Sequence, residues 1–394
     1  MNMGGKAALI VVFTISLLFS AYRLKTGSTS SKAAENLSNY YSKTVAHQIS
    51  ISGLNIAAAK LYEDYTWRGP MVNVPFRGGN FSLAFQTSGD TLMVLSTTKY
   101  YDISDTVAAF FESSNPYLKY TFFSGKENGV NWAPNDTIWG PVHTNTTLNH
   151  QNDESIVFYG KATAGKGISA PPKNAKTQFL GGYEVGVYVP EVTGMNDLIN
   201  QAAWNGYSFP FSPDTMKVEL NNDGTVDIYQ NSVRIKDNVN FSALAPNGAI
   251  YSPGPVVIFG PGKVNTPARG ISIASGDNVI LRTQVSYADD PVTNPNSDDI
   301  LALIAMNDII FDNSTITDWY VQTVLMAING SLTATNMNKA GHLDYLGSVY
   351  QSERGNAKMF QSFQKNYRHD ERLNYIKPPF YPGAANLRLL AWWE

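Results

Sequence analysis

The residues best suited to chemistry are the carboxylates of an acidic loop in the C-terminal half of the chain. Asp289 and Asp290 are followed a few residues later by Asp298 and Asp299. Paired carboxylates hydrolyse glycosides, clustered carboxylates bind Ca²⁺, and single aspartates cap turns by accepting hydrogen bonds from backbone N–H groups. The loop lacks the dense, regular spacing of a calcium motif, so turn formation is the favoured interpretation. These four aspartates remain weak candidates for Ca²⁺.

Cysteine and histidine chemistry is restricted by the composition. The chain has no cysteine and five histidines, which excludes a thiol nucleophile, a Cys-ligated metal and disulfide bonds. The histidines show no HExxH or comparable pair, so a His-based metal site is not expected. His143, followed by Thr144 and Asn145, is interpreted as a hydrogen-bonded corner residue. We therefore expect no catalytic residue, no cofactor other than a candidate Ca²⁺ ion, and no enzymatic activity.

Charge and aromatic content indicate a setting outside the cytoplasm. The net charge is −3 and only 15% of residues are charged, against roughly 25% in typical proteins. No basic excess suggests a nucleic-acid partner. Aromatic residues make up 12% of the chain; they can stack on sugars, but more often such residues cover a core or a subunit contact. The candidates for sugar stacking are Tyr100, Tyr101, Trp132, Trp139, Trp204 and Trp319.

The elements that position these residues begin with a long apolar run at the N-terminus. Residues 7–22 contain no charge, Lys6 precedes them, and Arg23 and Lys25 follow. As a helix the run spans roughly 24 Å at about 1.5 Å per residue, slightly less than the ~30 Å hydrocarbon core of a bilayer. Three interpretations fit: a cleaved secretory signal, an anchor retained in the inner membrane, or a helix that waits in the membrane and then joins a filament core.

A second helical segment is predicted over residues 31–65, after a break at Thr26, Gly27 and Ser28. Its apolar residues recur every three to five positions and form one stripe. A helix that is apolar at its tip and amphipathic behind it is typical of a stalk. The stripe comprises Leu37, Tyr40, Tyr41, Val45, Ile49, Leu54, Ala58 and Leu61.

Alternating residues after the helix predict a small antiparallel meander. The expected strands lie within residues 79–85, 91–96 and 104–111, where apolar and polar side chains alternate. One face of this meander would pack on the apolar stripe of the helix.

Short strands with polar corners predict a parallel β-helix over residues 120–365. Four times an Asn/Asp/Gly pair precedes a short apolar strand, at spacings of 20 to 30 residues typical of stacked coils. In this arrangement Ile280, Ile309 and Leu332 would point inward from successive coils. A β-sandwich is the alternative, favoured by a hairpin over residues 216–229 and by the imperfect period. The corner pairs are Asn247-Gly248, Asp277-Asn278, Asn307-Asp308 and Asn329-Gly330.

The N-terminal segment resembles the helix of type IV pilin-like proteins, especially minor or accessory ones. The similar features are Gly4 or Gly5 before the apolar run, the run itself, and the stripe that ends in residues 52–61. Ile10 departs from the common pattern, which has a Glu at that position if Gly5 ends the leader. Further segments resemble accessory pilins with β-helical ectodomains: residues 140–145, 287–291, 303–309, 365–373 and 378–382.

This resemblance implies a structural subunit of a cell-surface pilus-like filament. The chain would reside in the inner membrane before assembly, associate with copies of itself and with other pilins, and then stand outside the cell. The alternative is a membrane-anchored β-helix enzyme or lectin acting on surface polysaccharide. The expected assembly interface comprises Leu9, Val12, Phe13, Leu17, Leu18 and Tyr22.

The predicted organisation has four parts. Residues 1–65 form the membrane or filament helix, and residues 66–119 form the meander packed on it. Residues 120–365 form the β-helical ectodomain, and residues 366–394 form a tail docked on this body. The fold class is therefore mainly β with one long N-terminal helix.

Overall fold

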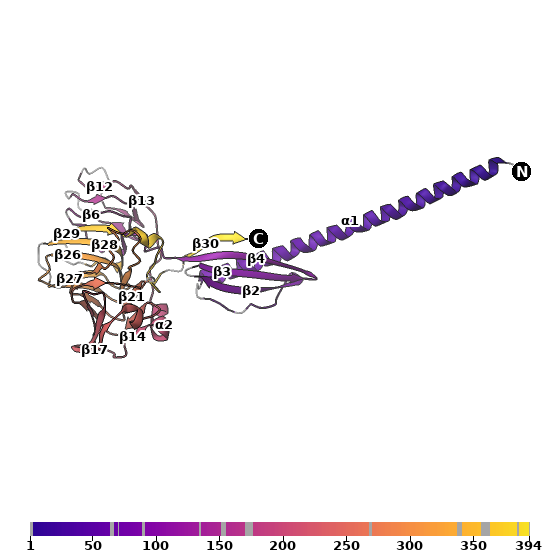
Figure 1. Ribbon diagram of the computed structural model, residues 1–394. Coiled ribbons are helices and arrows are strands. Elements are labelled where there is room, and N and C mark those ends of the chain that lie inside the picture. Colours follow the sequence, from indigo (N-terminus) through magenta and orange to yellow (C-terminus); the bar gives the residue numbers. More distant parts are fainter. Residues whose placement is uncertain are drawn as a thin grey trace. The chain divides into compact units, whose positions relative to one another are not determined.

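The computed structural model describes residues 3–63, 67–69, 71–88, 91–133, 135–150, 155–169, 176–267, 270–336, 341–355, 363–383 and 386–393. The fold is mainly β, with one long N-terminal helix followed by an antiparallel sheet and a parallel β-solenoid (Figure 1), which confirms the predicted fold class. The chain divides into two compact units, one of Met1–Ser114 with Ala385–Glu394 and one of Asn115–Ala384.

Helix α1 is continuous from Met3 to Glu63. The break predicted at residues 26–28 is wrong. Thr26 Oγ1 donates to the Tyr22 carbonyl oxygen at 2.8 Å, and Thr29 Oγ1 donates to that of Lys25 at 2.9 Å, so these hydroxyls are satisfied within the helix. A glycine in a helix costs only about 1 kcal/mol relative to alanine, which is too little to end a long helix.

The first unit contains one antiparallel sheet in the order β1-β2-β3-β4-β30. The last strand comes from the C-terminus, so part of the predicted tail pairs with the meander: Leu389 lies opposite Phe111 on β4. The strands are β1 (Val74–Phe76), β2 (Gly79–Ser88), β3 (Thr91–Tyr100), β4 (Ile103–Ser114) and β30 (Asn386–Trp393).

The apolar stripe of α1 packs on this sheet only along its C-terminal third. Ile49, Leu54 and Leu61 are fully buried against sheet residues such as Leu92 and Val94. The predicted stripe extends too far towards the N-terminus, because its first three members lie on a part of the helix that extends beyond the sheet. Leu37, Tyr40 and Tyr41 are exposed.

The second unit is a β-solenoid with two main sheets. In the first, parallel strands run in the order β12-β9-β6-β29-β28-β26-β24-β21-β18-β14, and a branch β13-β10-β7-β5 joins at β28. These strands are β5 (Phe122–Lys126), β6 (Thr137–Ile138), β7 (Val142–Thr144), β9 (Val157–Phe158), β10 (Ala162–Ala164), β12 (Gln178–Phe179), β13 (Tyr183–Val185), β14 (Tyr207–Ser208), β18 (Ala249–Ser252), β21 (Ile271–Ser275), β24 (Leu301–Ala305), β26 (Asp318–Ala327), β28 (Gly341–Glu353) and β29 (Phe363–His369).

The second main sheet runs in the order β17-β16-β15-β19-β22-β25-β27. The predicted hairpin is present in it: β15, β16 and β17 are antiparallel, while the other pairs are parallel. Its strands are β15 (Met216–Leu220), β16 (Val226–Gln230), β17 (Val233–Val239), β19 (Val256–Phe259), β22 (Val279–Leu281), β25 (Ile309–Asp312) and β27 (Leu332–Thr335). Two small pairs complete the coils: β8 (Thr147–Leu148) with β11 (Gly167–Ile168), and β20 (Lys263–Val264) with β23 (Ser286–Tyr287).

The coils do not stack in simple chain order. The first run of coils, from β5 to β13, leads away from β28. The second run begins with β14 at the far end of the sheet, and its coils stack successively until they reach β28 and β29. The two runs meet where β5 pairs with β28 and β6 pairs with β29, and we call these two pairings the seam. The expectation that each coil stacks on the preceding one therefore fails at the seam.

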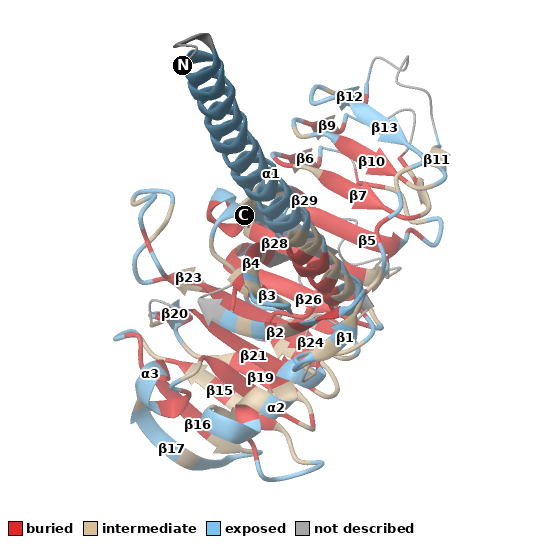
Figure 2. Cartoon of the chain, turned by 90° about the vertical axis from the view of Figure 1, so that its right-hand side faces the viewer, coloured by how far each residue is buried: buried red, intermediate tan, exposed pale blue. Residues whose placement is uncertain are grey.

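The segment between β13 and β14 connects the two runs along the outside of the first main sheet, and we call it the crossing segment. It includes α2 (Asn196–Asn205), and its Val192, Met195 and Leu198 are buried against residues such as Ile304 of β24. A short helix, α3 (Phe241–Leu244), and a 3₁₀ turn, η2 (Glu371–Asn374), lie elsewhere in this unit. The crossing segment covers the outer face of the first main sheet with apolar side chains. This sheet is therefore covered on both faces, and its strands are almost continuously buried in Figure 2.

Apolar side chains of both sheets fill the solenoid interior. Ile309 and Leu332 point inward as predicted, but Ile280 is wrong: it is half-buried, and its neighbour Val279 is the inward residue. A one-residue shift along a strand moves a side chain to the opposite face.

Candidate functional sites

The first candidate site is the apolar run of α1. The six predicted interface residues are all exposed, from 55% for Leu17 to 72% for Leu9. Ile10, Val11, Ile15 and Phe19 are exposed to a similar degree. These four residues were not among those predicted for the interface.

The apolar run is exposed on every side, so only an environment that surrounds the helix can bury it. Within the described residues, α1 is the one helix long and apolar enough to cross a membrane, and its most apolar window, of mean hydropathy 2.0, is not buried at all. Figure 2 shows its N-terminal half exposed throughout. A helix that is apolar all round requires burial in lipid or among other helices.

The acidic loop forms hydrogen-bonded turns. Asp299 is 2% exposed; one carboxylate oxygen accepts from the Thr266 N–H at 2.6 Å, and the other accepts from the Asp289 N–H at 2.9 Å. Arg372 donates to the Ser297 carbonyl oxygen at 2.8 Å, which places a guanidinium beside the loop. Asp299 thus accepts from backbone N–H groups 33 and 10 residues away, which joins the loop to another coil and is not a local turn contact.

The other three aspartates do not converge on one point. Asp289 accepts from the Asn294 side-chain amide at 2.7 Å, Asp290 accepts from the Val292 N–H at 2.9 Å, and Asp298 is exposed. Among the residues that the structure describes, no group of three or more His, Asp or Glu side chains is arranged to hold a metal ion.

His143 is buried, and polar side chains contact both of its ring nitrogens. Its Nε2 is 2.9 Å from Asn145 Oδ1, its Nδ1 is 2.7 Å from Thr163 Oγ1, and its ring stacks on Phe123. Asn145 Oδ1 also accepts from the Val189 N–H, so the Nε2 of a neutral His143 carries the hydrogen. Burial lowers the pKa of His143. The side chain is thus held in its neutral form by structural partners.

Among the candidate sugar-binding aromatics, two are buried and one is stacked, whereas Tyr101 and Trp204 are exposed at 75% and 78%. Trp132 and Trp319 are buried at 1% exposure. The Trp139 and Tyr159 rings stack at 3.9 Å with planes 3° apart, and the Arg368 guanidinium lies 6.0 Å from the Trp139 ring. Tyr159 therefore covers one face of Trp139, and the side chain remains 47% exposed.

Two buried ion pairs cross the seam, and the sequence did not single them out. Arg354 contacts Glu127 at 2.8 Å, and Lys365 Nζ contacts Asp136 Oδ1 at 3.1 Å. All four side chains are at most 10% exposed. Charged residues are almost never fully buried unless paired, but β29 reads Phe-Gln-Lys-Asn-Tyr-Arg-His, so its sequence does not mark Lys365 as buried.

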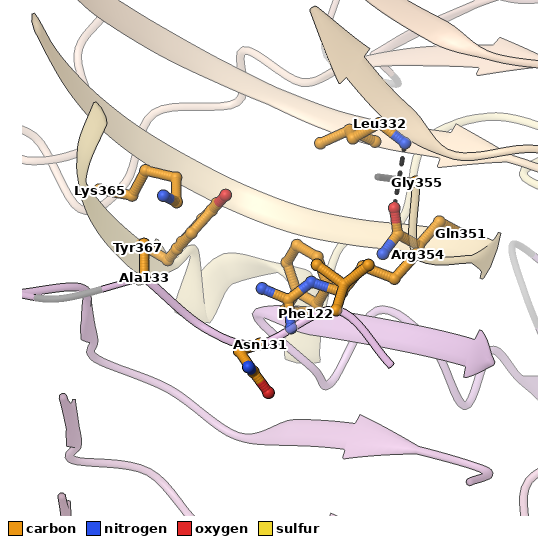
Figure 3. A pocket seen from close by; sticks show the side chains of 10 residues that line it. Phe122, Asn131, Ala133, Leu332, Gln351, Arg354, Gly355, Lys365 and Tyr367 are labelled. Carbon is orange, nitrogen blue, oxygen red and sulfur yellow. Dashed lines mark hydrogen bonds between the residues drawn. The ribbon is translucent and has the colours of Figure 1, made fainter. Parts of the chain in front are cut away.

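A cavity of about 50 Å³ adjoins these pairs. Figure 3 shows Lys365, Tyr367, Arg354 and Gln351 around it, and Gln351 accepts from the Leu332 N–H at 3.0 Å. The Arg354 guanidinium lies 4.1 Å from the Trp132 ring centroid, in a cation–π contact. The site combines cations, carboxylates and aromatic walls beside this cavity.

Comparisons with solved structures find a weak structural likeness. No family model matches the sequence, and no curated relative matches it. The structure is similar to the crystal structure of the competence-associated pilin ComZ from Thermus thermophilus, with a TM-score of 0.35 and 12% identity over 89% of this chain and 97% of that chain. Because this likeness is weak in both measures, the function of the chain is inferred from its own residues.

Proposed function

We propose that the chain is a structural subunit of a pilus-like filament at the cell surface. Before assembly the apolar run of α1 lies in the inner membrane, and on assembly it packs against copies of itself and against other pilins. The solenoid is the displayed body. Its role is structural and not enzymatic, and it needs no cofactor.

The observation that supports this proposal is the contrast within α1. Ile49, Leu54 and Leu61 are fully buried on the sheet, whereas residues 7–22 are exposed on all sides. The helix is continuous, and at about 1.5 Å per residue it extends about 90 Å. One end of a rigid rod is thus fixed to a folded unit, and the other end presents only apolar surface for burial elsewhere.

Helix packing and membrane anchoring require different things of the apolar run. A lipid environment requires hydrophobicity alone, whereas a bundle of helices also requires that side chains fit one another. Val12 lies at the middle of the run and is 64% exposed in the isolated chain. A substitution there can change either the hydrophobicity of the run or the shape of its surface.

The test compares two substitutions at Val12. Val12→Asp introduces a charge that costs about 2.5–3.5 kcal/mol at a membrane helix centre, and it should reduce both membrane insertion and filament formation. Val12→Trp keeps the run apolar but changes its shape, so it should leave membrane insertion intact and prevent filament formation. Membrane fractionation reports the first property, and electron microscopy of the assembled material reports the second.

Val72→Asp is the matched control, because Val72 is 68% exposed and lies outside α1. It should change neither insertion nor assembly. Circular dichroism should show that all three variants fold. Wild-type chains that insert in membranes but form no filaments would contradict the filament function and favour a plain anchor. Filaments of normal number from Val12→Trp would contradict the packing of the run against other helices at Val12.

A further inference from the structure

Lys365 and Asp136 meet across the seam from segments 229 residues apart in the chain. Lys365 lies on β29, Asp136 immediately precedes β6, and Lys365 Nζ is 3.1 Å from Asp136 Oδ1. Their side chains are 5% and 0% exposed. An amine nitrogen and a carboxyl group are therefore held in contact, away from bulk water.

The surroundings favour the uncharged forms of both groups. Trp132, Ile138 and Tyr367 are buried around the seam, and charges in such a setting lose their hydration. Burial raises the pKa of Asp136 and lowers the pKa of Lys365, against their mutual attraction. Both shifts favour transfer of a proton from the amine to the carboxyl, and in the resulting neutral forms the amine nitrogen has an electron pair to donate beside a carboxylic acid.

The backbone supplies donors to both carboxyl oxygens. The Ala133 N–H donates to Asp136 Oδ2 at 3.1 Å, and the Lys365 N–H donates to Oδ1 at 3.3 Å. Fixed N–H groups of this kind stabilise the negative charge that develops on oxygen when a nucleophile adds to a carboxyl carbon.

We propose that Lys365 Nζ and Asp136 Cγ condense into an amide bond that locks the seam covalently. The nitrogen electron pair adds to Cγ, and Oδ2 carries the developing charge beside the Ala133 N–H. The Cγ–Oδ1 bond then breaks, Oδ1 takes one proton from the amine in addition to the carboxyl proton, and one water molecule leaves. No oxidant, reductant or further reactant is needed.

The adjoining cavity provides a place for the released water. It is lined by Lys365, Tyr367 and Ala133 and encloses about 50 Å³ (Figure 3), whereas one water needs only ~10–15 Å³ measured this way. An amide needs no counterion, so the product also relieves the cost of keeping two charges buried.

A covalent lock at this position suits the topology of the solenoid. Strands on either side of the seam belong to different runs, so pairing them requires closure of a very long loop. The chain has no cysteine, and a cross-link that constrains the unfolded chain stabilises a fold in the way a disulfide does. This inference does not depend on the proposed function.

Two other ion pairs provide internal controls. Arg354 and Glu127 are as buried and as close, at 2.8 Å, but a guanidinium stays protonated and does not act as a nucleophile. Lys161 and Glu184 are 2.6 Å apart, but their side chains are 55% and 53% exposed, so this pair is not shielded from water. We expect a cross-link at neither pair.

The test is the intact mass of the full-length chain, purified in detergent and then denatured. The wild type should be lighter than its sequence by one water molecule, and peptide mapping should find one branched peptide that joins Lys365 to Asp136. Lys365→Arg keeps the charge, and it should restore the full mass and abolish the branch while circular dichroism confirms folding. A wild-type chain of full mass overturns the proposal even if the variant fails to fold, as does an equally abundant branch at Lys161 and Glu184.

Discussion

Val279 and Ile309 lie in register on adjacent coils of the solenoid, and both are fully buried. The same ladder continues to Leu332 on the next coil. The Ile309 N–H donates to the Ser331 carbonyl oxygen at 3.0 Å, so backbone and side chain both join this coil to its neighbour. The interior of the solenoid is therefore a column in which each side chain packs between those of the coils above and below.

Truncating the middle of this column should destabilise the solenoid. Ile309→Ala leaves a cavity between Val279 and Leu332, and such substitutions cost about 2–5 kcal/mol. Chemical denaturation should show the loss. Hydrogen exchange should rise first in β22 and β27, because each coil contacts only its neighbours.

Ile310→Ala is the matched control, because Ile310 is next in sequence but faces outward and is only half-buried. It should cost clearly less than Ile309→Ala. Equal losses from the two variants, or exchange that rises uniformly over the second unit, would contradict the column.

The sequence predicted this column better than it predicted its register. Corner pairs such as Asn307-Asp308 locate each strand, because they recur wherever the chain turns. They do not decide which of two adjacent apolar residues points inward, and Ile280 was chosen where Val279 is buried. β22 reads Val-Ile-Leu, apolar at every position although the outward Ile280 is only half-buried, so it lacks the alternation of apolar and polar residues that indicates which side chains point inward.

The seam could not be predicted from local patterns at all. Pairing of β5 with β28 depends on a crossing segment whose path is fixed by contacts distant in sequence. For the same reason, the partners of Asp136 and Lys365 could not be identified, and each residue has polar neighbours in the sequence, so neither is marked as buried. The apolar run of α1 needed no tertiary information, because its length and composition alone set it apart.

Asp299 should matter for stability, and Asp298 should not. Asp299→Asn replaces one of two carboxylate oxygens that accept from backbone N–H groups of Thr266 and Asp289. A buried donor left without an acceptor costs about 1–3 kcal/mol. Asp298→Asn, at an exposed position, should leave the midpoint of thermal unfolding almost unchanged.

The same two variants test the acidic loop for chemistry. We expect no polysaccharide hydrolysis by the wild type, and no rise in its unfolding temperature on adding Ca²⁺. Hydrolysis that Asp298→Asn abolishes, or a Ca²⁺-dependent rise that it removes, would assign the loop a role beyond its turns.

His143 should make the solenoid less stable as the pH falls. Burial lowers its pKa in the folded state, against the influence of the hydrogen bond to Asn145, and the positive charge of Lys119 acts in the same direction as burial. The unfolded chain therefore takes up a proton, near the ordinary pKa of about 6.5, before the folded chain does. The stabilisation is complete above that pH and decreases as the pH falls below it.

The measurement is the unfolding free energy of the wild type and of His143→Gln between about pH 5 and pH 8. The advantage of the wild type should shrink on acidification. Comparing the two variants removes the contribution of buried acids such as Glu127, whose pKa is raised by burial. His342→Gln, at an exposed histidine, is the control and should follow the wild type. A constant difference across the range would show that His143 does not titrate differently on unfolding.

Two glycines of α1 should respond oppositely to the same substitution. A Cβ at Gly53 would lie 2.8 Å from Phe81 Cδ2 and against Ser96 Oγ, whereas a Cβ at Gly27 would meet nothing within 4 Å. Gly53 thus allows the close approach of helix and sheet. Gly53→Ala gains about 1 kcal/mol of helix propensity but forces apart a buried contact, and overpacking of this kind costs about 1–3 kcal/mol.

We therefore expect Gly53→Ala to lower the stability of the first unit, and Gly27→Ala to leave it unchanged or slightly raised. Hydrogen exchange of β2 and β3 measures the effect where the helix packs, because Phe81 and Ser96 lie on these strands. Circular dichroism of both variants should show the same helix content, which separates lost packing from lost helix. If Gly53→Ala protects β2 and β3 as well as the wild type does, the helix does not need a glycine to reach the sheet, and its burial there must depend on Ile49, Leu54 and Leu61 alone.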